Sequence, residues 1–187
     1  VSGPSGVCVG SSVTLSVTPT GGIWTSSNAS ATVSGGVVTG ITPAIDTITY
    51  TISNVCGSDA ADMIMTVNPL PDAGVLSGTG LVCIGSPVTL SGTAGGGSWS
   101  ASNANATVSG GAVTGVTAGL DTVYYAVTNV CGTHTISKEM TINAIPVAGL
   151  TGPSTVCVSS AITFITTTSG GTWSSSGSGA TVLNGTV

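Results

Sequence analysis

Residues 46 to 56 read Asp-Thr-Ile-Thr-Tyr-Thr-Ile-Ser-Asn-Val-Cys, and residues 121 to 131 read Asp-Thr-Val-Tyr-Tyr-Ala-Val-Thr-Asn-Val-Cys. In the first stretch Ile48, Tyr50 and Ile52 alternate with polar residues, which is the period of two that predicts a β-strand with one buried face. The two stretches lie 75 residues apart. A period of that length indicates a whole domain copied in tandem rather than a short solenoid turn.

The tryptophans follow the same period. Trp24, Trp99 and Trp173 each stand two residues after a glycine pair. We expect each tryptophan to fill the space between two sheets, and the glycines to let the preceding loop turn tightly. Superposing the copies divides the chain into repeat 1 (residues 1–74), repeat 2 (75–149) and a partial repeat 3 (150–187), with short proline-bearing joints that should act as semi-rigid spacers.

Alternating segments recur through each copy, and no window has the spacing of an amphipathic helix. About seven short strands are predicted per repeat, and their spacing is typical of an all-β sandwich. In repeat 1 these strands should begin near Val7, Val13, Ile23, Ala31, Val37, Thr47 and Asp62.

Composition excludes several classes of partner. Only 4% of the residues are charged, and a single Lys or Arg accompanies six Asp or Glu. Nucleic-acid binding and adhesion to anionic lipid through basic residues are therefore excluded, and no apolar run is long enough to predict membrane insertion. A surface so poor in charge offers little mutual repulsion, so we expect self-association into a fibre or a covering of covalent glycans.

The cysteines recur with the repeats. Cys8 and Cys56 are 48 residues apart, as are Cys83 and Cys131. This spacing predicts one disulfide within each repeat, Cys8–Cys56 and Cys83–Cys131, with the partner of Cys157 outside the chain, and it favours an oxidising, extracellular location. A bond between Cys56 and Cys83, free buried thiols and a zinc site are the alternatives. A Cys56–Cys83 bond would require opposite ends of an extended two-domain unit to meet. A zinc site would lack closely paired ligands.

Two acidic residues precede tyrosines by four positions. Asp46 precedes Tyr50, and Asp121 precedes Tyr125, at the start of the long alternating strand of each repeat. This placement resembles the tyrosine corner of immunoglobulin-like sandwiches, in which the phenol bonds to backbone at the turn into the same strand. We expect these four residues and the tryptophans to form the structural centre of each repeat.

The sequence contains three further motifs, Trp-x-Ser-Ser-Asn, Ala-Thr-Val-Ser-Gly-Gly-x-Val-Thr-Gly and Asp-Thr-x-x-Tyr. Together they resemble the bacterial immunoglobulin-like repeats of large surface and secreted proteins of the Bacteroidetes type. Such repeats serve as stalks, spacers, adhesin arms and fibre subunits. The resemblance also implies O-glycosylation at Thr47 and Thr122, which follow Asp and precede an apolar residue; the alternative is that these aspartates serve only the tyrosine corner.

The sequence predicts no catalytic site, metal or cofactor. The acidic residues are scattered, and a calcium site at Asp59 and Asp62 would lack enough oxygen ligands. His134 is the single histidine. A nucleophilic triad with His134 as its base would therefore exist in one repeat alone and would still need an orienting residue, so we expect His134 to be a solvated turn residue.

We therefore expect a non-enzymatic, extracellular structural protein whose tandem immunoglobulin-like repeats form a stiff rod or surface filament. The alternative is an adhesin arm that binds glycan or a surface protein. Repeat 3 stops before its last strands, so we expect these residues to belong to a longer repetitive chain; completion of the repeat by a neighbouring chain is the other possibility.

Overall fold

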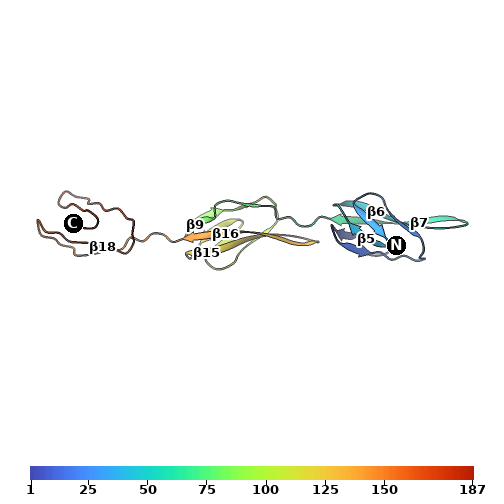
Figure 1. Cartoon of the computed structure of the whole chain (residues 1–187), viewed down its shortest axis with the longest axis horizontal. Coiled ribbons are helices and arrows are strands. Elements are labelled where there is room, and N and C mark those ends of the chain that lie inside the picture. Colours follow the sequence, from blue (N-terminus) through green and yellow to red (C-terminus); the bar gives the residue numbers. More distant parts are fainter.

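The computed structural model describes all 187 residues and shows three β units following one another along a single axis (Figure 1). The N-terminus lies in the unit at one end of this axis and the C-terminus in the unit at the other end. No helix in the chain has the length and apolar composition that a bilayer crossing would require.

The first unit is a sandwich of two antiparallel sheets to which one parallel strand is added. The four-stranded sheet has the order β1-β7-β6-β3, and the three-stranded sheet has the order β2-β5-β4. β1 pairs with β7 in parallel, whereas every other pairing is antiparallel. The strands are β1 (Gly6–Cys8), β2 (Ser12–Thr14), β3 (Ile23–Ser26), β4 (Ala31–Ser34), β5 (Val37–Gly40), β6 (Ala44–Asn54) and β7 (Gly57–Asn68).

The second unit repeats this arrangement and adds a two-residue ribbon. Its sheets have the orders β12-β15-β16-β9 and β10-β14-β13, and β8 pairs with β11. The strands are β8 (Leu76–Ser77), β9 (Leu81–Cys83), β10 (Pro87–Thr89), β11 (Ser91–Gly92), β12 (Ser98–Ala101), β13 (Ala106–Ser109), β14 (Ala112–Gly115), β15 (Gly119–Asn129) and β16 (Gly132–Asn143).

This topology confirms the predicted fold class. In the first unit β3-β6-β7 and β2-β5-β4 have the order of strands C-F-G and B-E-D in an immunoglobulin sandwich. Seven strands form there, and five of them begin at or within one residue of the predicted starts.

The last two strands begin earlier than expected, β6 at Ala44 and β7 at Gly57. The first six residues of β7 are exposed, so they carry no alternation that a sequence pattern could reveal. They are strand because they pair with β6 up to Asn54, which lies opposite Gly57. The β6–β7 hairpin therefore extends beyond the sandwich, and it is visible as the protruding tip at the N-terminal end in Figure 1.

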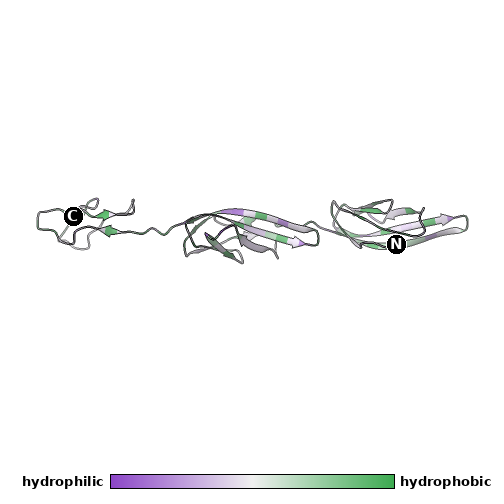
Figure 2. Cartoon of the chain, turned by 90° about the horizontal axis from the view of Figure 1, so that it is seen from below, coloured by the Kyte–Doolittle hydropathy of each residue, from purple (hydrophilic) through white to green (hydrophobic).

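Each complete unit has its own core. In the first, apolar side chains of both sheets meet, including Val38 of β5, Ile48 of β6 and Met65 of β7, all fully buried. The second core contains the equivalent Val113, Val123 and Met140. Green apolar segments alternate with white and purple ones along the long hairpins (Figure 2), as expected of strands with one buried face. The predicted boundaries at residues 74 and 149 lie outside both clusters and stay predictions.

The third unit is mostly irregular. It contains only β17 (Leu150–Thr151) and β18 (Ile165–Thr166), which pair with each other, and neither core cluster includes any of its residues. The division of the chain into two complete repeats and a partial one stays a prediction.

Candidate functional site

The tryptophan and tyrosine of each complete unit form a cross-strand pair. Trp24 of β3 lies opposite Tyr50 of β6, with ring centroids 4.9 Å apart. Trp99 and Tyr125 repeat the pair at 4.7 Å. Trp24 is half-buried against the first core, and its indole approaches Gly36 in the β4–β5 turn of the opposite sheet. The indole thus lies at the edge of the space between the sheets.

The glycine pair before the tryptophan of each complete unit has two separate roles. Gly21 has φ +98°, in the left-handed region that side chains disfavour. Gly22 lies against the tyrosine: a Cβ there would be 2.5 Å from Cζ of Tyr50, too close for any real contact. Gly96 and Gly97 repeat both features in the second unit. The second glycine therefore allows close approach to the ring, which the prediction of a tight turn did not include.

The tyrosine hydroxyls do not form the predicted tyrosine corner. Tyr50 Oη donates to the carbonyl of Pro19 at 3.0 Å and accepts from the backbone N–H of Gly22 at 2.6 Å. Both partners lie in the loop before β3 rather than in the turn that leads into β6. Tyr125 does the same with Ala94 and Gly97. Trp24 and Tyr50 face each other across β3 and β6, so this phenol reaches the loop that precedes the tryptophan.

The aspartates hold a different loop. Asp46 is 1% exposed and its carboxylate accepts four hydrogen bonds, from the hydroxyl and backbone N–H of Ser27, the hydroxyl of Ser26 and the backbone N–H of Ala31. Burial raises the pKa of Asp46, but these hydrogen bonds together outweigh it and hold the pKa below its ordinary value. In the second unit burial again raises the pKa of Asp121, and hydrogen bonds from Ser102, Ala106, Thr122 and Asn103 lower it overall.

Thr47 and Thr122, the predicted glycosylation positions, lie within β6 and β15. Both are half-buried, and each backbone N–H donates to the hydroxyl of a serine in the adjacent loop, Ser27 and Ser102 respectively. The carboxylate of the aspartate before each threonine accepts the hydrogen bonds from the loop described above.

The predicted disulfides within repeats are wrong. The structure joins Cys8 to Cys131, with Cα atoms 5.7 Å apart, and leaves Cys56, Cys83 and Cys157 free and exposed. Cys8 lies opposite Asn68, at the end of the twelve-residue strand β7. Cys56 immediately precedes the start of that strand, so Cys8 and Cys56 are about 40 Å apart at 3.3 Å per residue. That separation far exceeds the roughly 7 Å that a disulfide allows.

The bond crosses the junction between the first two units. The tip of the β15–β16 hairpin, residues 129–132, extends past its own sandwich to the end of β7. There Asn129 Nδ2 donates to the carbonyl of Pro69 at 3.0 Å, and the Cys131 sulfur lies 3.8 Å from the carbonyl of Asn68. One hairpin thus binds the last strand, the joint and the first strand of the preceding unit.

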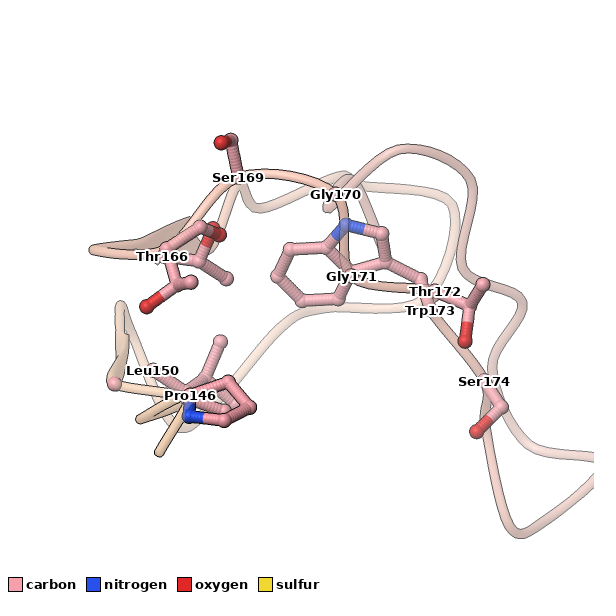
Figure 3. A pocket seen from close by; sticks show the side chains of 12 residues that line it. Pro146, Leu150, Thr166, Ser169, Gly170, Gly171, Thr172, Trp173 and Ser174 are labelled. Atoms are coloured by element: carbon pink, nitrogen blue, oxygen red, sulfur yellow. The ribbon is translucent and has the colours of Figure 1, made fainter. Parts of the chain in front are cut away.

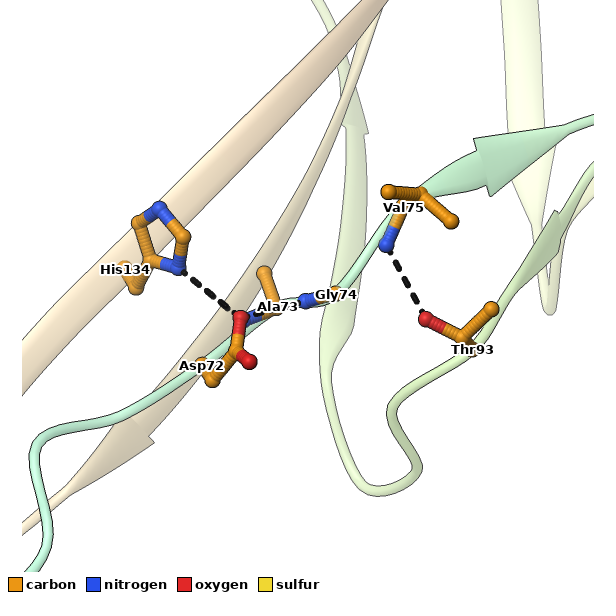
Figure 4. A network of polar contacts seen from close by, with 6 residues as sticks. All are labelled: Asp72, Ala73, Gly74, Val75, Thr93 and His134. Carbon is orange, nitrogen blue, oxygen red and sulfur yellow. Dashed lines mark hydrogen bonds and ion pairs between the residues drawn. The ribbon is translucent and has the colours of Figure 1, made fainter.

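The joint itself is held along the same hairpin (Figure 4). His134 Nδ1 of β16 accepts from the backbone N–H of Ala73 at 3.0 Å and lies 3.6 Å from Asp72 Oδ1. Ala73 is fully buried. The N–H of Val75 donates to Thr93 Oγ1 at 3.0 Å, which anchors the joint to the second unit. His134, predicted to be a solvated turn residue, is in fact a contact of the joint.

Trp173 borders an open hollow in the third unit (Figure 3). The hollow has a volume of about 630 Å³ and is lined by the indole, the glycines before it, Pro146, Leu150 and several Ser and Thr residues. In the complete units a tyrosine covers the indole, and residues 150–187 contain none. Phe164, at 6.4 Å between ring centroids, is the aromatic neighbour instead.

Sequence reasoning missed the junction residues Pro69, Ala73, Asn129 and His134. One signal was present: the hairpin turn Asn-Val-Cys-Gly is identical in both repeats although its residues are almost wholly exposed. A shared exposed tip that contains a cysteine indicates a contact outside its own domain.

The architecture defines the class of the protein: an all-β chain of repeated sheet pairs whose strand orders resemble those of tandem immunoglobulin-like domains. No protein-family model matches the sequence, and no curated protein matches it.

Solved structures that match are distant. A crystal structure of the S-layer protein rSbsC is 18% identical over 76% of this chain, with a TM-score of 0.28; the chain spans 22% of that protein. An I-band fragment of titin is 11% identical over 87% of this chain and 72% of that chain, with a TM-score of 0.38. A chimeric titin tandem is 17% identical over 74% of this chain and 94% of that chain, with a TM-score of 0.22. These likenesses concern the fold alone.

Proposed function

We propose that this chain is a non-enzymatic, extracellular structural protein whose repeats form a stiff rod or part of a surface filament. The observation that carries the proposal is the Cys8–Cys131 bond, which joins two consecutive units to each other rather than closing either one. A domain stabilised for its own sake would carry its disulfide internally. A bond between neighbours restricts how the units move relative to each other.

The contacts around this bond support the same role. The β15–β16 hairpin accounts for one hydrogen bond at Pro69 and a second at Ala73, and Thr93 adds a third from the other side of the joint. Inter-domain motion is the default where an interface is small and polar. Here a covalent bond and three hydrogen bonds are distributed along a joint of a few residues, which opposes bending.

The disulfide also supports an extracellular location, because disulfides form and persist in oxidising compartments outside the cytoplasm. The net charge of −5 and the 4% charged residues leave outer faces of Ser, Thr and backbone groups. Such faces repel each other little, which favours side-by-side packing of rods or glycan attachment.

The experiment is small-angle X-ray scattering of the full chain before and after reduction. We expect the oxidised chain to scatter as an extended, stiff particle, and the Cys8→Ser variant or reduced protein to show a broader distribution of interatomic distances. Cys157→Ser is the matched control, because Cys157 is free in the structure and its loss leaves the Cys8–Cys131 bond and the stiffness of that junction unchanged. An oxidised wild-type chain that scatters as a flexible, bent ensemble would refute the proposal.

A further inference from the structure

We propose that Cys56 and Cys83 each form a disulfide with a further repeat of this kind. Each bond would repeat the junction that Cys8 and Cys131 form within the chain. Cys56 would take the first-strand cysteine of a preceding repeat, and Cys83 would take the hairpin-tip cysteine of a following one. The inference rests on the proposed rod function and adds to it a partner and a rule of pairing.

Cys56 has the surroundings that Cys131 has in the formed junction. Both follow a hairpin strand of eleven residues and precede one of twelve. The N–H of Cys56 donates to Asn54 Oδ1 at 2.8 Å, and the N–H of Cys131 donates to Asn129 Oδ1 at 2.7 Å. The hairpin tip of the first unit therefore has the strand lengths and the Asn–Cys hydrogen bond of the bonded tip, and Asn54 occupies the position that Asn129 has in the second unit.

Cys83 has the surroundings of Cys8. Each ends a three-residue strand paired in parallel with the last strand of its unit, Cys8 opposite Asn68 and Cys83 opposite Asn143. The residue after each cysteine donates to the carbonyl of that asparagine, at 3.1 Å and 3.0 Å. The carbonyl of each cysteine accepts from the N–H three residues later, at 2.9 Å and 3.1 Å. A hairpin tip that fits at Cys8 finds the same backbone at Cys83.

The first-strand position recurs once more. The carbonyl of Cys157 accepts from the N–H of Ser160 at 3.0 Å, as those of Cys8 and Cys83 do from the residues three positions on. The chain therefore carries three cysteines at the first-strand position of their repeats (Cys8, Cys83 and Cys157, of which Cys157 lies outside any strand) and two hairpin-tip cysteines (Cys56 and Cys131). The one disulfide in the structure, Cys8–Cys131, joins a cysteine of the first-strand group to a cysteine of the hairpin-tip group.

Pairing within one unit is excluded by the distance along β7 given above, and the same geometry along β16 separates Cys83 from Cys131. A metal is not supported either, because no group of three or more His, Cys, Asp or Glu side chains is gathered in the structure. A disulfide partner for Cys56 or Cys83 would then have to come from another repeat. A second copy of this chain supplies such a repeat.

The chemistry requires an external disulfide as oxidant, such as glutathione disulfide. The Cys56 thiolate attacks one sulfur of this oxidant, which forms a mixed disulfide and releases one glutathione thiolate. The first-strand thiolate of the second copy then attacks the Cys56 sulfur, which forms the protein disulfide and releases the second glutathione. Two protein thiols are oxidised, one external disulfide is reduced, and the two protons pass to the released thiolates.

The test mixes equal amounts of ordinary and ¹⁵N-labelled full-length chain, reduced and then oxidised in a glutathione redox buffer. Multimers are separated by non-reducing electrophoresis, and their disulfide-linked peptides are identified by mass spectrometry. We expect a shift from monomer to multimers in which isotopically mixed peptides join Cys56 of one copy to Cys83 or Cys157 of another. Peptides that join Cys56 to Cys56, or Cys83 to Cys83, should be absent.

Two variants sharpen the result. Cys56→Ser should abolish the multimers while the Cys8–Cys131 peptide persists within single copies. Asn54→Asp keeps the Oδ1 acceptor for the Cys56 N–H but removes the amide donor, so it should reduce the multimer yield; Asn129→Asp is the matched change at the junction already formed.

Monomers with a free Cys56 thiol, or linkages distributed without regard to the two groups, would overturn the inference. The Cys8–Cys131 peptide and the scattering measurement report on the rod itself. A chain that is stiff but does not link Cys56 to a first-strand cysteine would therefore refute this inference alone.

Discussion

Replacement of Asp46 by alanine should destabilise the first unit by about 2.5–4 kcal/mol. Two of its four hydrogen-bond donors, the hydroxyls of Ser26 and Ser27, can turn toward water when the carboxylate is removed. The N–H of Ala31 cannot, because Ala31 is 2% exposed. Its loss of a charged acceptor costs about 1.5–3 kcal/mol, and the backbone N–H of Ser27 adds about 1 kcal/mol. A typical domain has a margin of 5–15 kcal/mol, so this is a large share of the stability.

The assay is native-state amide exchange of the full chain, read at Ala31 and Ala106. These two N–H groups are equivalent, since Ala106 donates to Asp121 at 2.9 Å as Ala31 donates to Asp46 at 3.0 Å. Asp46→Ala should accelerate exchange at Ala31 by about a hundredfold or more, at a factor of ten per 1.4 kcal/mol, and leave Ala106 nearly unchanged. Asp121→Ala is the matched variant with the reverse pattern.

Acid provides an independent check on the same carboxylate. The folded-state pKa of Asp46 is lowered, so its stabilising contribution is complete above the unfolded-state pKa of about 3.9 and is lost as pH falls through the lower folded-state pKa. The difference in unfolding free energy between wild type and Asp46→Ala should therefore be constant at neutral pH and shrink below about pH 4. A difference under 1 kcal/mol at pH 7, or one that grows in acid, would refute the assignment of Asp46 as the acceptor that holds this loop.

Three further outcomes are expected from the same chain. Gly22→Ala should destabilise the first unit by several kcal/mol, because the new Cβ would overlap the Tyr50 ring; urea unfolding followed by Trp24 fluorescence measures it, and an unchanged midpoint would contradict the contact. Tyr50→Phe removes a hydroxyl that bonds Pro19 and Gly22, so the midpoint should fall by an amount equivalent to about 1–2 kcal/mol with the slope retained. Peptide mapping of the non-reduced protein should recover a peptide that joins Cys8 to Cys131, whereas recovery of Cys8–Cys56 would contradict the junction.

The sequence predicted the fold because each core strand carries its own evidence. Ile48 and Met65 alternate with half-buried or exposed neighbours in strands that pack on one face, and the structure shows both side chains fully buried. The glycine pair and the tryptophan also marked a real structural centre. The sequence could not show that the second glycine lies against a tyrosine ring, because that contact depends on the register between β3 and β6.

The disulfide pairing could not be predicted for a different reason. In a periodic chain, each first-strand cysteine could bond to the hairpin tip of its own repeat or to the hairpin tip of the next repeat. Both patterns recur with the same period. Spacing alone cannot separate the two patterns. What separates them is the parallel pairing of β1 with β7, which carries Cys8 to the opposite end of the unit from Cys56. The exposed start of β7, with no alternation to reveal it, concealed how far the hairpin extends.

The position of Cys131 has a consequence for cleavage by proteases. The polypeptide passes from one unit to the next through residues 69–75, and the sulfur bridge makes a second covalent route around that segment. A cut in the backbone there would leave both halves attached, held by sulfur alone. Severing the chain at this point requires two unrelated chemical events, hydrolysis and reduction, at the same place.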